Sequence, residues 1–306
     1  MTDLVYKSAE GAAAVAAKYR RVLDQWPTPK TEFSLATRQG PTFVIACGPD
    51  NAPPIVLLHG SQANSAAWFF DVASWATEFR LFAVDMIGEP GFSARVRPSL
   101  ADETHALWLD DVFAGLGLSR AALAGVSLGG WLALDYATRR PQAVGALALI
   151  CPAGIGRQKN FLLKVWPLLL LGSWGQRKIR EMAFGPAPET ISSDMRLFGD
   201  LMETIGRVVR PRVVSIPQLT DAEIQKLAAP ILAIIGGRDV LIDSNDTRAR
   251  LKKDAPHAEI CFLDDGYHFL PGQTARVMDF LMRRGAGDDH AARASATASA
   301  PAGKRS

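Results

Sequence analysis

The 306-residue chain has few of the residues that build metal sites, with three cysteines and five histidines. Cys47, Cys151 and Cys261 each end or lie inside a short apolar run, and no Cys-x-x-Cys pair or cysteine–histidine cluster occurs. We therefore expect no metal, and three thiols buried in strands, because free cysteine packs like a small hydrophobic residue. An odd number of cysteines and an N-terminus without the features of a secretory leader favour the cytoplasm.

The chain also lacks a strong charge of one sign and a long apolar run. Its formal net charge is +3, and part of that lies in Lys304 and Arg305 at the end of the chain. This excludes the concentrated basic patch of a nucleic-acid-binding protein. The most apolar stretch, residues 161–171, is interrupted by Lys164 and Pro167 and is too short to span a bilayer. The oligomeric state has no signature in the sequence.

Short β-like runs alternate with helix-length segments along most of the chain. Apolar residues make up 48% of the sequence and charged residues 21%, which is typical of a folded protein. The expected strands are 42–47, 55–60, 81–85, 121–125, 146–151, 231–236 and 259–263, with a weaker one at 32–38. The expected helices are an Ala-rich N-terminal segment ending near residue 26, then 66–78, 102–116, 128–140, 246–254 and 275–284. This alternation predicts an α/β fold with a mostly parallel eight-stranded sheet flanked by helices.

One interval, residues 154–225, interrupts the alternation. It has no convincing strand, holds many apolar and aromatic residues, and is too long for a structureless loop in a compact domain. We predict a helical cap insertion there, which divides the core into residues 1–153 and 226–284. The Ala-, Ser- and Gly-rich segment 285–306 is predicted to be a disordered tail.

The strongest chemical signal is the sequence GVSLGG at residues 125–130. A bare Gly-x-Ser-x-Gly match is weak, but here an apolar strand precedes it and a helical segment follows it. That context is typical of a nucleophile elbow, a sharp turn between a strand and a helix that exposes the serine at its apex. Ser127 is therefore the predicted nucleophile, and a serine hydroxyl needs a nearby base to become reactive.

With this motif the chain resembles the α/β-hydrolase superfamily over nearly its whole ordered length. His59-Gly60 resembles the family's oxyanion-loop motif, which implies that the backbone N–H groups of Ser61 and Leu128 form the oxyanion hole. Residues 85–93, DMIGEPGFS, resemble the loop D-x-x-G-x-G-x-S of capped family members, with one extra residue and a proline. In this variant the chain resembles a bacterial carboxylesterase-like subgroup of the family.

The remaining catalytic residues implied by the resemblance follow in the order serine, acid, histidine. His268 lies in the loop after the last strand, where the family has its base. Asp239 follows the strand 231–236, where the family has the acid that orients the base. Asp243 lies four residues further on and stays an alternative to Asp239.

The resemblance implies an enzyme without a cofactor that hydrolyses a carboxylic ester of small or medium hydrophobic character through an acyl-enzyme on Ser127. Trp68, Phe161 and Trp166 are candidates for the substrate pocket, although each is also a typical core residue. The same fold and triad serve C–C bond hydrolases, lactonases, perhydrolases and lyases, and non-catalytic ligand-binding members, so these functions stay open. Haloalkane dehalogenases and epoxide hydrolases are disfavoured, because their elbow carries aspartate.

Overall fold

A computed structural model describes residues 3–186, 191–212 and 214–285 of the chain. Beyond Gly285, the predicted disordered tail lies outside the described residues. The centre of the molecule is one eight-stranded sheet with the order β1-β2-β4-β3-β5-β6-β7-β8. The strands are β1 Lys30–Thr37, β2 Gly40–Cys47, β3 Pro54–Leu58, β4 Arg80–Val84, β5 Ala121–Val126, β6 Val144–Ile150, β7 Ile231–Gly236 and β8 Glu259–Leu263.

Only the β1–β2 and β2–β4 pairs are antiparallel, and the pairs from β4 through β8 are parallel. The predicted α/β fold with a mostly parallel sheet is therefore confirmed. Its central strands are continuously apolar because both faces are covered. In β3, for example, Val56 and Leu58 join the core on one face, while Ile55 and Leu57 join the core on the other.

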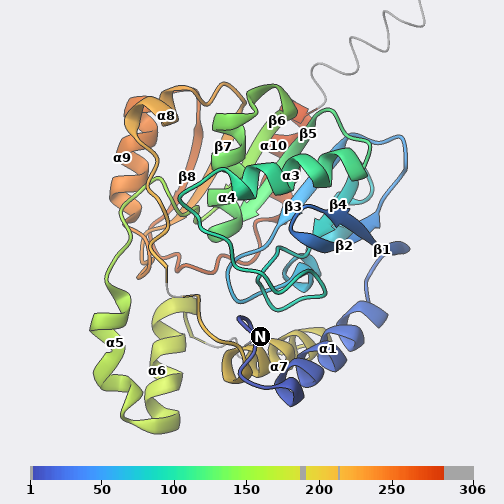
Figure 1. Cartoon of the computed structure of the whole chain (residues 1–306). Helices are drawn as coiled ribbons and strands as arrows, with labels where there is room; N and C mark the ends of the chain where they lie inside the picture. Colours follow the sequence, from blue (N-terminus) through green and yellow to red (C-terminus); the bar gives the residue numbers. More distant parts are fainter. Residues whose placement is uncertain (1–2, 187–190, 213, 286–306) are drawn as a thin grey trace, which may run out of the picture.

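Helices lie on both faces of the sheet, as Figure 1 shows. Their bounds are α1 Ala9–Asp24, α2 Val72–Trp75, α3 Thr104–Gly115, α4 Leu128–Arg139, α5 Phe161–Leu169, α6 Gly172–Phe184, α7 Ser193–Val208, α8 Asp221–Gln225, α9 Ser244–Asp254 and α10 Thr274–Gly285, with 3-10 turns η1 Ser65–Trp68 and η2 Pro141–Ala143. Side chains of α3, α4, α8 and α9 pack in one core, and those of α1, α2, α7 and α10 in the other. Within the described residues, no helix combines the length and the apolar character needed to cross a bilayer.

The prediction of one helix over residues 66–78 is wrong, because the segment is divided into η1 and α2. Between them, backbone N–H groups bond to carbonyls three residues earlier, as from Asp71 to Trp68. Asp71 and Trp75 both hydrogen-bond to Thr274 at the start of α10. Contacts with α10 therefore outweigh the local helical pattern.

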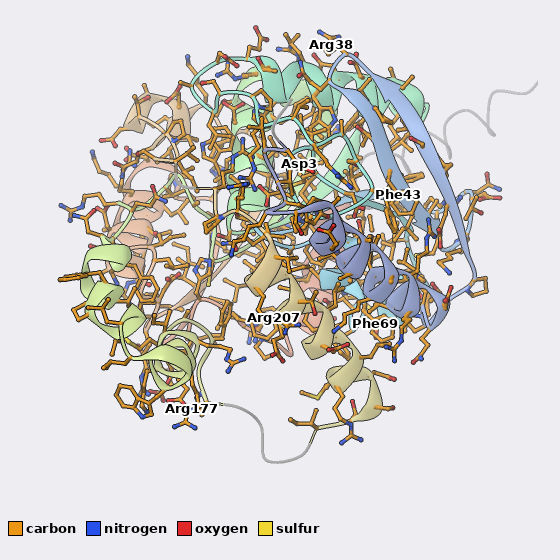
Figure 2. The ribbon with its side chains drawn as sticks, turned by 60° about the horizontal axis from the view of Figure 1, so that its bottom comes forward. Asp3, Arg38, Phe43, Phe69, Arg177 and Arg207 are labelled. Carbon is orange, nitrogen blue, oxygen red and sulfur yellow. The ribbon has the colours of Figure 1, made fainter. Side chains whose placement is uncertain are left out.

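The interval 154–225 contains α5, α6, α7 and α8, in agreement with its predicted helical character. α7 lies beside the N-terminal helix α1 (Figures 1 and 2), and the N–H of Lys7 donates to the carbonyl of Val208 at the end of α7. The α5–α6 pair lies apart from them at one side of the molecule. That the whole interval acts as one cap stays a prediction.

The three cysteines are free thiols. Cys47 in β2 and Cys151 directly after β6 are buried, but Cys261 is only partly buried. The prediction of three buried strand thiols is thus wrong for Cys261, because β8 is the edge strand and has a neighbour on one side only.

Candidate active site

The turn between β5 and α4 forces an unusual backbone conformation on Ser127. Its φ is 52° and its ψ is −110°, a strained region for a residue with a side chain. A Cβ atom at Gly125 would overlap the backbone of Gly129, and one at Gly129 would overlap the carbonyl oxygen of Leu58. Gly125 therefore lets β5 pass close to the first turn of α4, and Gly129 lets that turn lie against the end of β3.

Ser127, His268 and Asp239 form one chain of hydrogen bonds. Ser127 Oγ lies 2.9 Å from His268 Nε2, and His268 Nδ1 lies 2.7 Å from Asp239 Oδ2. Because a carboxylate only accepts, Nδ1 carries the ring proton and Nε2 is free to accept from the serine hydroxyl. His268 and Asp239 are both buried. The arrangement can remove a proton from Ser127, as in a nucleophile–base–acid triad.

The other oxygen of Asp239 is held by the backbone. Asp239 Oδ1 accepts from the N–H groups of Leu241 at 2.8 Å and Ile242 at 3.1 Å, so Oδ2 faces the histidine. Asp243, the alternative acid, instead caps α9 by accepting from the N–H of Asp246. The geometry brings Asp239, and not Asp243, to His268.

The two candidate oxyanion donors belong to segments that meet at the elbow. Leu128 is the first residue of α4, and the first N–H groups of a helix have no carbonyl partner within it. Ser61 follows Gly60, where a Cβ atom would lie 3.8 Å from the Cβ of Ser127. Both segments therefore lie next to the serine, and the helix dipole of α4 favours negative charge there.

The loop that carries Ser61 is attached to the loop after β4. His59, fully buried, donates from Nδ1 to the carbonyl of Gly60 and accepts at Nε2 from the N–H of Met86. Burial lowers the pKa of His59, so its ring is neutral and suited to this double role. The amide of the Asn64 side chain donates to the carbonyl of Pro90. The sequence motif His59-Gly60 located this loop but did not reveal these attachments.

The three candidate pocket residues are in different surroundings. Trp68 is buried in the core beside Trp75, with ring centroids 5.7 Å apart. Phe161 is buried in a small cluster with Val165 and Ala183. Trp166 is 58% exposed on α5. None of the three takes part in the hydrogen bonds of Ser127 or His268, so their role in a pocket stays a prediction.

The end of α6 contacts the histidine loop. The carbonyl of Ala183 accepts from the N–H of His268 at 3.2 Å. Phe184 and Phe269, about half exposed, meet edge to face with centroids 6.3 Å apart. An aromatic pair thus lies next to His268.

A buried thiol also lies beside the candidate triad. Within the described residues, Cys151, Asp239 and His268 are the potential metal ligands that come together, with ligand atoms within 4.8 Å of one another. The histidine and the aspartate are already hydrogen-bonded to each other. Burial, with the nearby Asp239 carboxylate, raises the pKa of Cys151 to about 12. The thiol is therefore neutral near pH 7, and a neutral thiol is a poor nucleophile.

Comparison with known proteins agrees with this architecture. A family model described as alpha/beta hydrolase family matches residues 55–280. An uncharacterized carboxylesterase, nap, of Bacillus subtilis is 30% identical over 87% of this chain and 90% of the relative. Carboxylesterase YbfK of the same organism is 29% identical over 91% of this chain and 97% of the relative. The crystal structure of naproxen esterase from B. subtilis superimposes with a TM-score of 0.77 at 27% identity, covering 90% of this chain and 99% of that one.

Proposed function

The chain belongs to the alpha/beta hydrolase family, and we propose that it is a carboxylesterase whose triad is Ser127, His268 and Asp239. The observation that carries the residue assignment is the continuous hydrogen-bond chain from Ser127 Oγ through the His268 ring to Asp239. The relatives named as carboxylesterases, matched over nearly their whole length, support ester hydrolysis as the reaction.

In the first half-reaction Ser127 Oγ attacks the ester carbonyl carbon while His268 Nε2 takes the hydroxyl proton. The carbonyl π electrons move to its oxygen, and the N–H groups of Ser61 and Leu128 stabilise that oxyanion. Asp239 holds the ring and stabilises its positive charge. When the tetrahedral intermediate collapses, the alkoxide leaves with the proton from Nε2, and the acyl group stays on Ser127.

In the second half-reaction water attacks the acyl-enzyme. His268 Nε2 takes a proton from the water, the same oxyanion hole stabilises the second tetrahedral intermediate, and the protonated Ser127 leaves. The products are a carboxylic acid and an alcohol. No step needs a metal or an organic cofactor.

The substrate that fits best is an ester with a small or medium hydrophobic acyl or alcohol group. The half-exposed Phe184–Phe269 pair beside His268 supports an apolar binding surface there. Residues 154–225 act, in this proposal, as the cap that carries Phe184 to the site. The free thiols support a reducing compartment such as the cytoplasm.

The test is release of p-nitrophenol from esters of increasing acyl length by the wild type and by Ser127→Ala. We expect turnover by the wild type, greatest for short or medium acyl chains, and a loss of at least about 10³-fold in the variant. Equal rates in the two proteins would overturn the nucleophile. A preference for charged or very long esters would overturn the proposed substrate class.

A further inference from the structure

A buried carboxylate holds the loop that carries Ser61. Glu89, in the loop after β4, is only 1% exposed, and its Oε2 accepts from the N–H of Gln62 at 2.7 Å. Gln62 has a φ of 55°, a left-handed conformation that a residue other than glycine rarely adopts. Because Gln62 directly follows Ser61, this hydrogen bond sets the direction of the peptide next to the candidate oxyanion donor.

Glu89 forms an ion pair with an arginine from a distant part of the chain. Arg212 follows α7, its side chain is 4% exposed, and its Nη1 lies 3.4 Å from Glu89 Oε1. Its Nη2 donates to the carbonyl of Pro98 at 3.0 Å. Arg97 ties the same two segments together by donating to the carbonyls of Gly88 and Arg210. The segment after α7 is thereby fixed to the loop that contains Glu89.

A small cavity lies between Arg212 and the first residue of α4, Leu128. It has a volume of about 10 Å³, close to the smallest that can hold one water molecule, and His105 is also among the residues that line it. Arg212 Nε and His105 Nδ1 are buried without a protein partner. On its other side Arg212 lines an open pocket of about 390 Å³. Arg212 therefore lines both the small cavity beside Leu128 and the open pocket.

We propose that Glu89 and Arg212 are a pair of positioning residues that holds the Ser61 N–H in the oxyanion hole. The inference rests on the proposed esterase function. Neither residue touches the reacting atoms; Glu89 acts through Gln62, and Arg212 acts by matching the buried charge of Glu89.

The physical reason is the cost of a buried charge that has lost its partner. Removing one member of a buried ion pair leaves the other unpaired and is more harmful than removing both. Without Arg212, the loop with Glu89 must shift toward water, and the Gln62 N–H and the Ser61 N–H shift with it. An oxyanion donor contributes mainly in the transition state, so a displaced Ser61 lowers kcat more than it changes KM.

The experiment compares Arg212→Met, Glu89→Gln and the double variant. Arg212→Met is expected to lower kcat about 10- to 100-fold with KM within about threefold of the wild type. Glu89→Gln keeps an oxygen that accepts from Gln62 while it removes the charge. In the Glu89→Gln background, Arg212→Met is therefore expected to change kcat less than about threefold. Arg212→Lys, which keeps the charge, is expected to recover most of the loss.

A second measurement separates positioning from general stability. A boronic acid or trifluoromethyl ketone, whose adduct with Ser127 resembles the tetrahedral intermediate, is expected to lose affinity for Arg212→Met in proportion to kcat/KM. The affinity for the product carboxylic acid stays unchanged. Arg139→Met, which breaks an ion pair with Asp135 within α4, serves as control and is expected to lower Tm and leave kcat unchanged.

Wild-type kcat in Arg212→Met, or equal losses from Arg212→Met in both backgrounds, would overturn the inference and leave the esterase proposal intact. Loss of affinity for the tetrahedral analogue and the product in equal measure would also overturn it. A wild type that hydrolyses no ester would overturn the proposed function, and the inference with it. If Arg212→Met does not fold, Arg212→Lys and the double variant still decide between these results.

Discussion

Replacing Asp239 with asparagine tests the orientation of His268 directly. Oδ1 of Asp239 accepts from two backbone N–H groups, so the asparagine oxygen is required in that position. The amide NH₂ group then faces His268 Nδ1, which lies 2.7 Å from the present Oδ2. An NH₂ group only donates, so Nδ1 becomes the acceptor and the ring proton moves to Nε2. In that tautomer Nε2 cannot take the proton of Ser127.

For a triad held in the wrong tautomer, the expected loss in kcat is about 10³- to 10⁴-fold, which corresponds to about 4 to 5.5 kcal/mol in the activation barrier. The assay is steady-state hydrolysis of a p-nitrophenyl ester at pH 7.5, with Tm measured on the same samples. Asp243→Asn is the matched control, because asparagine also caps helices well, and it is expected to keep wild-type kcat. Full activity in Asp239→Asn, or a large loss in Asp243→Asn alone, would refute this assignment.

Two further predictions concern stability and are checked by thermal unfolding. Gly129→Ala is expected to destabilise the fold by about 3 kcal/mol, because its Cβ atom would overlap the Leu58 carbonyl. At Gly199 in α7 an added Cβ atom meets no atom within 4 Å, so Gly199→Ala is expected to stabilise the fold by about 1 kcal/mol. Burial raises the pKa of Asp71 from 3.8 to about 6, so the folded state binds its proton more tightly than the unfolded state does, and stability falls as pH rises from about 4 to 6. That difference corresponds to about 3 kcal/mol, so Asp71→Asn, which can still accept from Thr274, is expected to raise Tm at pH 8 and much less at pH 4. Equal shifts at the two pH values, or a stabilised Gly129→Ala, would contradict the respective prediction.

The sheet was predictable because its central strands are buried on both faces and therefore have continuously apolar sequences. The prediction of one continuous helix was wrong for residues 66–78. The spacing of apolar residues there suits a helix, but Asp71 and Trp75 hydrogen-bond to Thr274. That interaction joins residues about 200 positions apart in the sequence, and local periodicity carries no information about it. The same holds for the packing of α1 on α7.

The candidate triad could be identified because each member follows a recognisable strand in a fixed order. The contacts that support the triad could not be identified from the sequence. Glu89 lies in a loop whose extra residue and proline drew attention, but nothing in the sequence relates it to Arg212, which lies 123 positions further on. The sequence around Cys151 shows only an apolar run and does not indicate that the thiol lies near Asp239. That position depends on the pairing of β6 with β7.

Covalent labelling with a fluorophosphonate, followed by peptide mass spectrometry, shows whether Ser127 is a nucleophile activated by His268. We expect one phosphonyl group per chain, attached to Ser127. Labelling should slow by at least about 10³-fold in His268→Ala and stop in Ser127→Ala. Labelling at another residue, or an unchanged rate in His268→Ala, would show that Ser127 is not a nucleophile activated by His268.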